Sequence, residues 1–130
     1  MEKTGTIEQL EGGSALIEWF GGIPSFHDAT LLTLELSQAG QGLLRARTFK
    51  IGSDTDAEGY FIQTKTVLVT FSIFNLLEVE LFEFMEAGIM DGLFVHVDEE
   101  GTELGWDASY GVHGRLKAKK VTLSFEPTQP

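Results

Sequence analysis

The sequence contains no cysteine and only three prolines in 130 residues. Without thiols the chain can form neither a disulfide framework nor a thiolate metal site. No apolar run approaches the roughly 20 residues that a membrane-spanning helix needs. The first residues show no basic segment followed by an apolar block, so we expect no secretory signal, no membrane partner and a cytoplasmic location.

Lysine and arginine are absent from the whole stretch between Lys65 and Arg115. The formal net charge is −11, which argues against a nucleic-acid partner because the phosphates would be repelled. One interpretation of the acidic stretch is a solvated surface that keeps the protein soluble. The other is a surface that steers and selects a basic protein partner. The candidate contact residues for such a partner are Glu78, Glu80, Glu83, Glu86, Asp91, Glu99, Glu100 and Glu103.

The apolar residues that are present, 42% of the chain with ten phenylalanines, are enough for one packed domain over residues 1–130. Alternation of apolar and polar residues predicts strands, which are joined by short turns and not by long helices. The predicted strands lie at 29–36, 43–51, 66–73, 77–81, 93–97 and 115–125. We therefore expect a mainly β (α+β) fold. Its sheet would be antiparallel and curved, or a two-layer sandwich, of about seven strands with one short N-terminal helix. A closed barrel is less favoured.

Local signals set the boundaries of these elements. Ser14 is a candidate cap for the helix, and Gly21-Gly22 would end it. Residues 52–59 have the composition of a loop, and Phe74-Asn75 looks like a tight connection between two strands. The period-two pattern slips by one residue at Lys119-Lys120, which predicts a β-bulge in the last strand.

Residues 19–29 combine two glycines, a proline, aromatic residues and a His-Asp pair in a short segment. This pattern predicts a fixed turn between the helix and the first strand. Asp28 would accept backbone N–H groups in an Asx-turn, and His27 would hold the loop. The alternative is a binding loop, since aromatic residues are frequent at interfaces. The residues assigned to the structural turn are Trp19, Gly21, Pro24, Phe26, His27 and Asp28.

Catalytic motifs are not evident in the sequence. We find no phosphate-binding glycine loop, nucleophile elbow or zinc-protease motif, and assign no catalytic residue, metal or cofactor. His96 and Asp98 are two residues apart on a predicted strand and so share one face. Together with His27 and Asp28 they could form a metal site. That spacing is not diagnostic, and a small metal-dependent enzyme remains an alternative.

The Pro24-Ser-Phe-His-Asp-Ala29 string, preceded by Trp19-x-Gly21 and followed by alternating strands, resembles the immunity protein 50 family of bacterial polymorphic toxin systems. The resemblance extends over residues 14–126 and implies a mostly β protein that binds and neutralises a cognate toxin. Nuclease toxins are basic, so an acidic inhibitor could mimic their substrate. We expect a stoichiometric inhibitor, monomeric or homodimeric, and not an enzyme. A further alternative is an assembly protein that pairs through a sheet edge or the apolar segment Phe82–Phe94.

Overall fold

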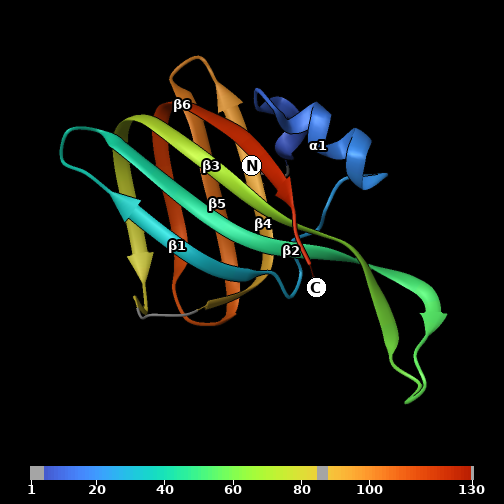
Figure 1. Ribbon diagram of the computed structural model, residues 1–130. Coiled ribbons are helices and arrows are strands. Elements are labelled where there is room, and N and C mark those ends of the chain that lie inside the picture. Colours follow the sequence, from blue (N-terminus) through green and yellow to red (C-terminus); the bar gives the residue numbers. More distant parts are fainter. Residues whose placement is uncertain (1–4, 85–87, 130) are drawn as a thin grey trace.

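The computed structural model describes residues 5–84 and 88–129. It contains a 3-10 turn, one helix and six strands, and the sheet closes into an antiparallel barrel in the order β1-β2-β3-β6-β5-β4 (Figure 1). The elements are η1 (Ile7–Gln9), α1 (Gly13–Phe20), β1 (Thr30–Leu36), β2 (Gln41–Thr55), β3 (Phe61–Phe82), β4 (Gly88–Asp98), β5 (Gly101–Tyr110) and β6 (His113–Pro127). No helix in the described ranges is long and apolar enough to span a membrane.

The mainly β, antiparallel fold with one short N-terminal helix is confirmed, but the sheet is closed and has six strands. Closure depends on two residue pairs between β1 and β4, Thr30 with Ile89 and Leu31 with Gly88. These pairs join segments that are far apart in the sequence, so no local pattern could indicate them.

The predicted turn at Phe74-Asn75 does not exist, so the predicted strands 66–73 and 77–81 are one strand. β5, in contrast, was not among the predicted strands. β3 continues through Phe74-Asn75 as a strand of 22 residues. Asn75 takes a left-handed conformation with φ 58°, and the register with β6 shifts between Leu76 and Glu78. Such a bulge bends and twists a strand without ending it. β3 therefore passes from the layer with β1 and β2 into the layer with β6, β5 and β4 (Figure 1).

The barrel interior is filled by the alternating apolar side chains that the sequence predicts. Val67, Val69, Phe71 and Ile73 of β3 are all buried. β6 is buried at Leu116 and Ala118 and again at Val121 and Leu123, while Lys119 and Lys120 are both exposed. The predicted change of phase is thus present in β6. The register shift, however, is in the partner strand, between Leu76 and Glu78.

The β2–β3 hairpin extends beyond the barrel as a two-stranded arm (Figure 1). The predicted loop at 52–59 is shorter than expected, because β2 runs to Thr55 and β3 begins at Phe61. The Asp56 carboxylate closes the turn by accepting the backbone N–H groups of Glu58 and Tyr60, both at 3.0 Å. In this way the arm presents an exposed tip away from the core.

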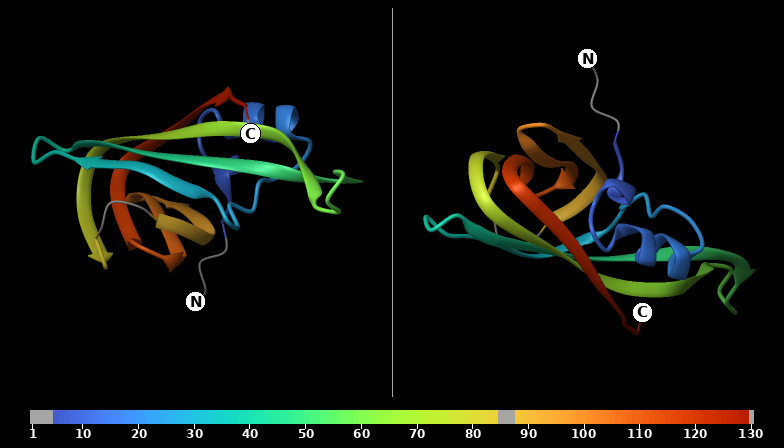
Figure 2. Two further views of the ribbon diagram at one scale, coloured as in Figure 1. Left: turned by 60° about the horizontal axis from the view of Figure 1, so that its bottom comes forward. Right: turned by 90° about the horizontal axis from the view of Figure 1, so that it is seen from above.

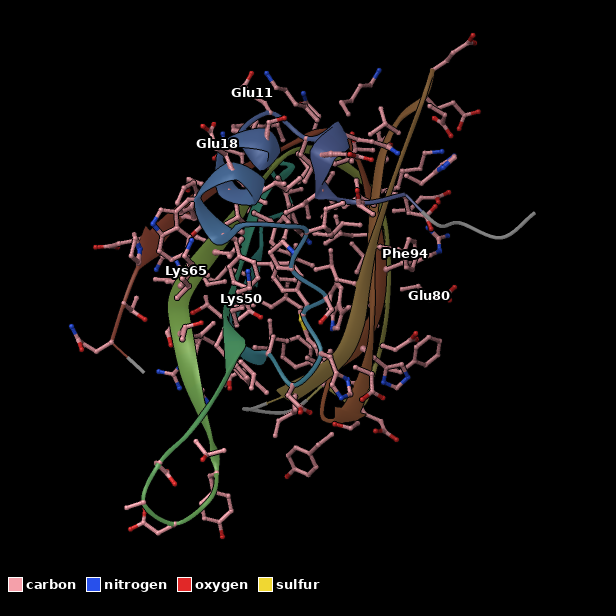
Figure 3. The ribbon with its side chains drawn as sticks, turned by 90° about the vertical axis from the view of Figure 1, so that its right-hand side faces the viewer. Glu11, Glu18, Lys50, Lys65, Glu80 and Phe94 are labelled. Carbon is pink, nitrogen blue, oxygen red and sulfur yellow. The ribbon has the colours of Figure 1, made fainter. Side chains whose placement is uncertain are left out.

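Helix α1 packs beside the barrel near the start of the arm (Figure 2). Its N-cap is Gly12, with φ 92°, and not the predicted Ser14, which lies inside the first turn. A Cβ at residue 12 would lie 1.8 Å from the Leu123 carbonyl oxygen, so this position requires glycine. The end of α1 at Gly21 is as predicted, and the N–H of Gly21 donates to the Ile17 carbonyl. Lys50 and Lys65, seen below α1 in Figure 3, donate to the carbonyls of Phe20 and Trp19. Cations at a helix C-terminus are favourable for the helix dipole.

Candidate functional site

The outer side of β3, β6, β5 and β4 carries a mixed but predominantly acidic surface, which we call the acidic face. Its central row is Arg115 and Lys117 of β6. Glu78 of β3 and Glu103 of β5 lie directly opposite Lys117 on its two sides, and Glu80 lies opposite Arg115. Because side chains alternate along strands, these residues share the outer face while Leu116 and Ala118 enter the core. The acidic face consists of Glu78, Glu80, Asp98, Glu100, Glu103, Arg115 and Lys117.

Arg115 links two of the acidic strands. Its guanidinium lies 3.3 Å from the Glu78 carboxylate and 3.8 Å from that of Glu103. The Glu103 side chain is only 5% exposed, so its carboxylate would be costly to bury without a charged partner. Glu103 therefore has a structural role beneath the face, whereas Glu78 remains largely exposed at its surface.

Lys117 organises the hairpin between β4 and β5. Its ammonium donates a 2.7 Å hydrogen bond to the Glu100 carboxylate and lies 4.0 Å from that of Asp98. The hydrogen bond to Glu100 raises the pKa of Lys117 above its ordinary 10.5. The Asp98 carboxylate accepts the backbone N–H groups of Glu100 and Gly101, as expected for a turn at Glu99-Glu100-Gly101. These bonds, the first above all, together with Lys117, lower the pKa of Asp98.

Aromatic side chains flank the charged rows. The Phe94 ring of β4 covers Gly105, its cross-strand neighbour on β5, where an added Cβ would lie 2.1 Å from the ring. At the other end of the face Phe82 stacks on His113, with ring centroids 5.4 Å apart. Figure 3 shows Phe94 and Glu80 on the same side of the molecule, away from α1, and the register places Gly105 and Arg115 between them. The face thus combines carboxylates with accessible aromatic surface.

The predicted contact residues do not all belong to this face. Glu78, Glu80, Glu100 and Glu103 gather there, with Glu99 exposed in the adjoining turn. Glu83 follows the end of β3, and Asp91 lies near the start of β4, beside the His27 loop. Glu86 lies outside the described residues. Arg115 and Lys117 were not predicted as members of the face, although the cluster of cations in the last predicted strand was a signal that could have indicated them.

The Trp19–Ala29 segment forms the joint between α1 and β1. Phe26, in a left-handed conformation with φ 61°, is buried against Phe71 with ring centroids 6.0 Å apart. Trp19 packs against Phe125 at 5.7 Å, Pro24 is buried, and Gly21 ends the helix. The aromatic residues of this segment are therefore directed into the core.

His27 and Asp28 fix the joint in a different way from the predicted Asx-turn. The backbone N–H of Asp28 donates to the Met90 carbonyl, and Met90 N–H donates to Ala29. A His27 ring nitrogen lies 3.3 Å from the Asp91 carbonyl oxygen. The Asp28 carboxylate is exposed and lies 3.7 Å from His27 Nε2. Main-chain bonds to β4 thus hold the turn, and the His-Asp pair lines the rim of a shallow groove of about 300 Å³ against β2.

The two His-Asp pairs are not brought together. His27 contacts Asp91 near the start of β4, whereas His96 and Asp98, 3.6 Å apart, lie at its end. Among residues 5–84 and 88–129 no group of three or more His, Cys, Asp or Glu side chains is arranged to hold a metal ion. The arrangement needed by the metal-dependent alternative is therefore not assembled in the described part of the chain.

No protein-family model, curated protein or solved structure matches this chain.

Proposed function

We propose that this protein is an immunity protein, a stoichiometric inhibitor that binds a cognate bacterial toxin domain through the acidic face. The Pro24–Ala29 string supports the class of function by its resemblance to the immunity protein 50 family. The acidic face supports the mode of binding. A cytoplasmic location belongs to the same proposal, because the inhibitor must be present where the toxin acts.

The observation that carries the mode of binding is the surplus of carboxylates around two cations. Arg115 and Lys117 are surrounded by Glu78, Glu80, Asp98, Glu100 and Glu103. A surface of one predominant sign attracts a partner of the opposite sign and speeds its association. A toxin that binds nucleic acid is basic for the same reason, which makes a nuclease domain the partner of matching charge.

Co-expression with the product of the adjacent gene tests this proposal. We expect rescue of growth and a stable one-to-one complex. If the adjacent protein is toxic and is neither bound nor neutralised, the proposal is wrong.

Charge reversal of one residue on the acidic face and of two that border it tests the role of this surface. Glu80, Glu83 and Glu99 are exposed, and the described structure places no cation within ion-pair distance of them. Replacing all three with lysine should slow association by about tenfold or more at low salt. The matched control replaces Glu18 of α1, Glu35 of β1 and Glu58 in the turn of the arm, which are also exposed. Equal slowing by both sets would show that only net charge matters.

A further inference from the structure

Beyond Phe74, β3 has a hydrogen-bonded neighbour on only one side. Its pairing with β2 ends at Gln41 opposite Phe74, and the N–H of Leu76 makes the last bond on that side, to the Gly40 carbonyl. Pairing with β6 continues from there to Phe82 opposite His113. Within the described ranges no strand pairs with the other edge of residues 77–82. This free edge, which we call the β3 edge, is a template for an additional strand.

The side chains along the β3 edge alternate in a way that defines the strand it would accept. Glu78 and Glu80 lie on the outer face, opposite Lys117 and Arg115. Val79 and Leu81 lie on the inner face, opposite Leu116 and Gly114. Leu77 and Phe82 are 48% and 49% exposed, which is unusual for large apolar residues on a strand beside the core.

Charge disfavours a second copy of this chain as the occupant. Antiparallel pairing of two copies centred on Val79 would place Glu78 of one copy opposite Glu80 of the other. Centring on Glu80 would place the two Glu80 side chains opposite one another. Like charges directly opposite across a strand pair are destabilising. Glutamates on an exposed edge thus act against self-association, as charged edge residues do in other β proteins.

The same charges favour a basic occupant. Arg115, the residue opposite Glu80, directs its guanidinium to Glu78 and Glu103, and the described structure shows no ion pair for Glu80. A strand added at the edge would place one side chain next to Glu80 on the outer face and its neighbours in the chain beside Val79 and Leu81. Lysine or arginine suits the first position, and apolar residues suit the others.

We infer that the β3 edge binds an extended segment of alternating basic and apolar residues, which adds a seventh strand to the sheet. The inference rests on the proposed function in one respect, that the toxin supplies this segment. Main-chain hydrogen bonds provide the affinity of such an addition, and the alternating side chains provide its specificity.

A synthetic hexapeptide, Lys-Val-Lys-Leu-Lys-Val with blocked termini, is the probe for the edge itself. We expect it to slow exchange by about tenfold at saturation for those amides of residues 77–82 that point away from β6, since new main-chain bonds protect amides from exchange. The peptide Glu-Val-Glu-Leu-Glu-Val should give no protection. If the basic peptide leaves these amides unprotected, or protects another part of the molecule instead, the inference is overturned.

Two matched variants distinguish specific binding of the peptide at the β3 edge from attraction by the net charge of the protein. Glu80→Lys and Glu18→Lys change the net charge equally, and Figure 3 shows that Glu18 lies on α1, away from Glu80. Glu80→Lys should abolish protection of the edge, while Glu18→Lys should retain it. Unchanged exchange at Val67 and Val69, both fully buried, shows that each variant is folded. Equal loss in both variants would contradict a specific edge site.

Hydrogen exchange on the complex with the adjacent gene product distinguishes the two proposals. Protection of residues 77–82 in that complex supports both of them. If the complex forms and rescues growth while these amides exchange as in the free protein, the immunity function stands and strand addition is wrong. If the peptide protects the edge but the adjacent product neither binds nor is neutralised, strand addition stands and the immunity function is wrong.

Discussion

Arg115 Nη1 lies 3.8 Å from the carboxylate of Glu103, whose side chain is almost fully enclosed between β4 and β6. The same guanidinium reaches Glu78 on β3. One cation on the central strand therefore connects both neighbouring strands and compensates a buried charge.

Replacing Arg115 with methionine should destabilise the protein by about 1–3 kcal/mol, because the nearly buried Glu103 carboxylate loses the attraction of the guanidinium while the apolar stem is kept. The expected loss of unfolding free energy is smaller than for a fully buried ion pair, since the Arg115 side chain is one-third exposed. Urea unfolding measures it. Arg45→Met, at an exposed position on β2, is the control. Restoration of stability by adding Glu103→Gln would confirm the cause, and an unaltered urea midpoint in the single variant would contradict it.

Asp98 should make stability fall in acid. Its pKa is lowered in the folded protein, chiefly by the Glu100 N–H bond, so it stabilises the fold above its ordinary pKa of 3.8. That contribution is lost as the pH falls through the lowered value. Asp98→Asn keeps an oxygen for the turn but cannot titrate, so its urea midpoint should fall less steeply below about pH 4. Glu18→Gln is the control, because it removes one carboxylate elsewhere and shows how such a charge change alters the dependence of the urea midpoint on pH. If Asp98→Asn and the wild type lose stability equally steeply in acid, the assignment to Asp98 is wrong.

Lys117 should have the opposite pH dependence. Its pKa is raised by the hydrogen bond to Glu100, so its stabilising contribution is complete below the ordinary 10.5 and is lost as the pH rises through the higher folded value. Lys117→Met should be less stable than the wild type at neutral pH. The difference between the two should narrow in strong alkali, as measured by unfolding at a series of pH values. A constant difference would show that packing of the stem is the cause.

Trp106 is the largest fully buried side chain, and its indole N–H donates to the Val112 carbonyl at 2.9 Å. Trp106→Phe leaves that buried oxygen without its donor and should cost about 1–3 kcal/mol, with a further loss for the smaller ring. Thermal or urea unfolding measures the change. Trp19→Phe is the matched control, because Trp19 is the other of the two tryptophans in the chain and is only half-buried. Equal losses would show that ring volume alone is responsible.

Two glycines on the strands beneath the acidic face, Gly105 of β5 and Gly114 of β6, should differ in their tolerance of alanine. At Gly105 a Cβ meets the outer atoms of the Phe94 ring, which can rotate away. At Gly114, with φ 146°, it would lie 2.0 Å from the Glu80 carbonyl oxygen, where only the backbone could move. We expect about 1 kcal/mol for Gly105→Ala and clearly more for Gly114→Ala. Urea unfolding of the two variants measures this, and the midpoint of Gly114→Ala should be the lower. A lower midpoint for Gly105→Ala would contradict the structure.

The alternation of apolar side chains was sufficient to predict most of the strands and much of the core, because burial on one face is a local, period-two property. Val67 to Ile73 illustrates this, since each predicted inward residue is buried. The alternation did not reveal β5, Gly101–Tyr110, which contributes Leu104 and Trp106 to the core. A second error lay in predicting where one strand ends and the next begins. Phe74-Asn75 resembles a turn, but the left-handed Asn75 and the bulge at Leu77 bend β3 and do not reverse it. The sequence cannot distinguish these outcomes, because pairing with Ala118 and Lys120 decides between them.

The acidic face was only partly predictable for a similar reason. A gap in positive charge is visible in the sequence, whereas the register that places Arg115 between Glu78 and Glu103 is not. Glu103 was therefore predicted as a contact residue, although its carboxylate is buried. The free edge of β3 depends on where β2 ends, which again is a property of pairing between strands.

The length of β3 has a consequence for how the chain assembles during synthesis. Val69 pairs with Ala46 in the preceding strand and with Phe125 in the last one. The first pairing can form as soon as the hairpin has left the ribosome, while the second waits until β6 has been made. Until then the inward apolar side chains of β3, such as Val69, are exposed, and the edge of β3 that will pair with β6 is free to aggregate. A nascent chain arrested before residue 113 should therefore require chaperones that the complete barrel does not.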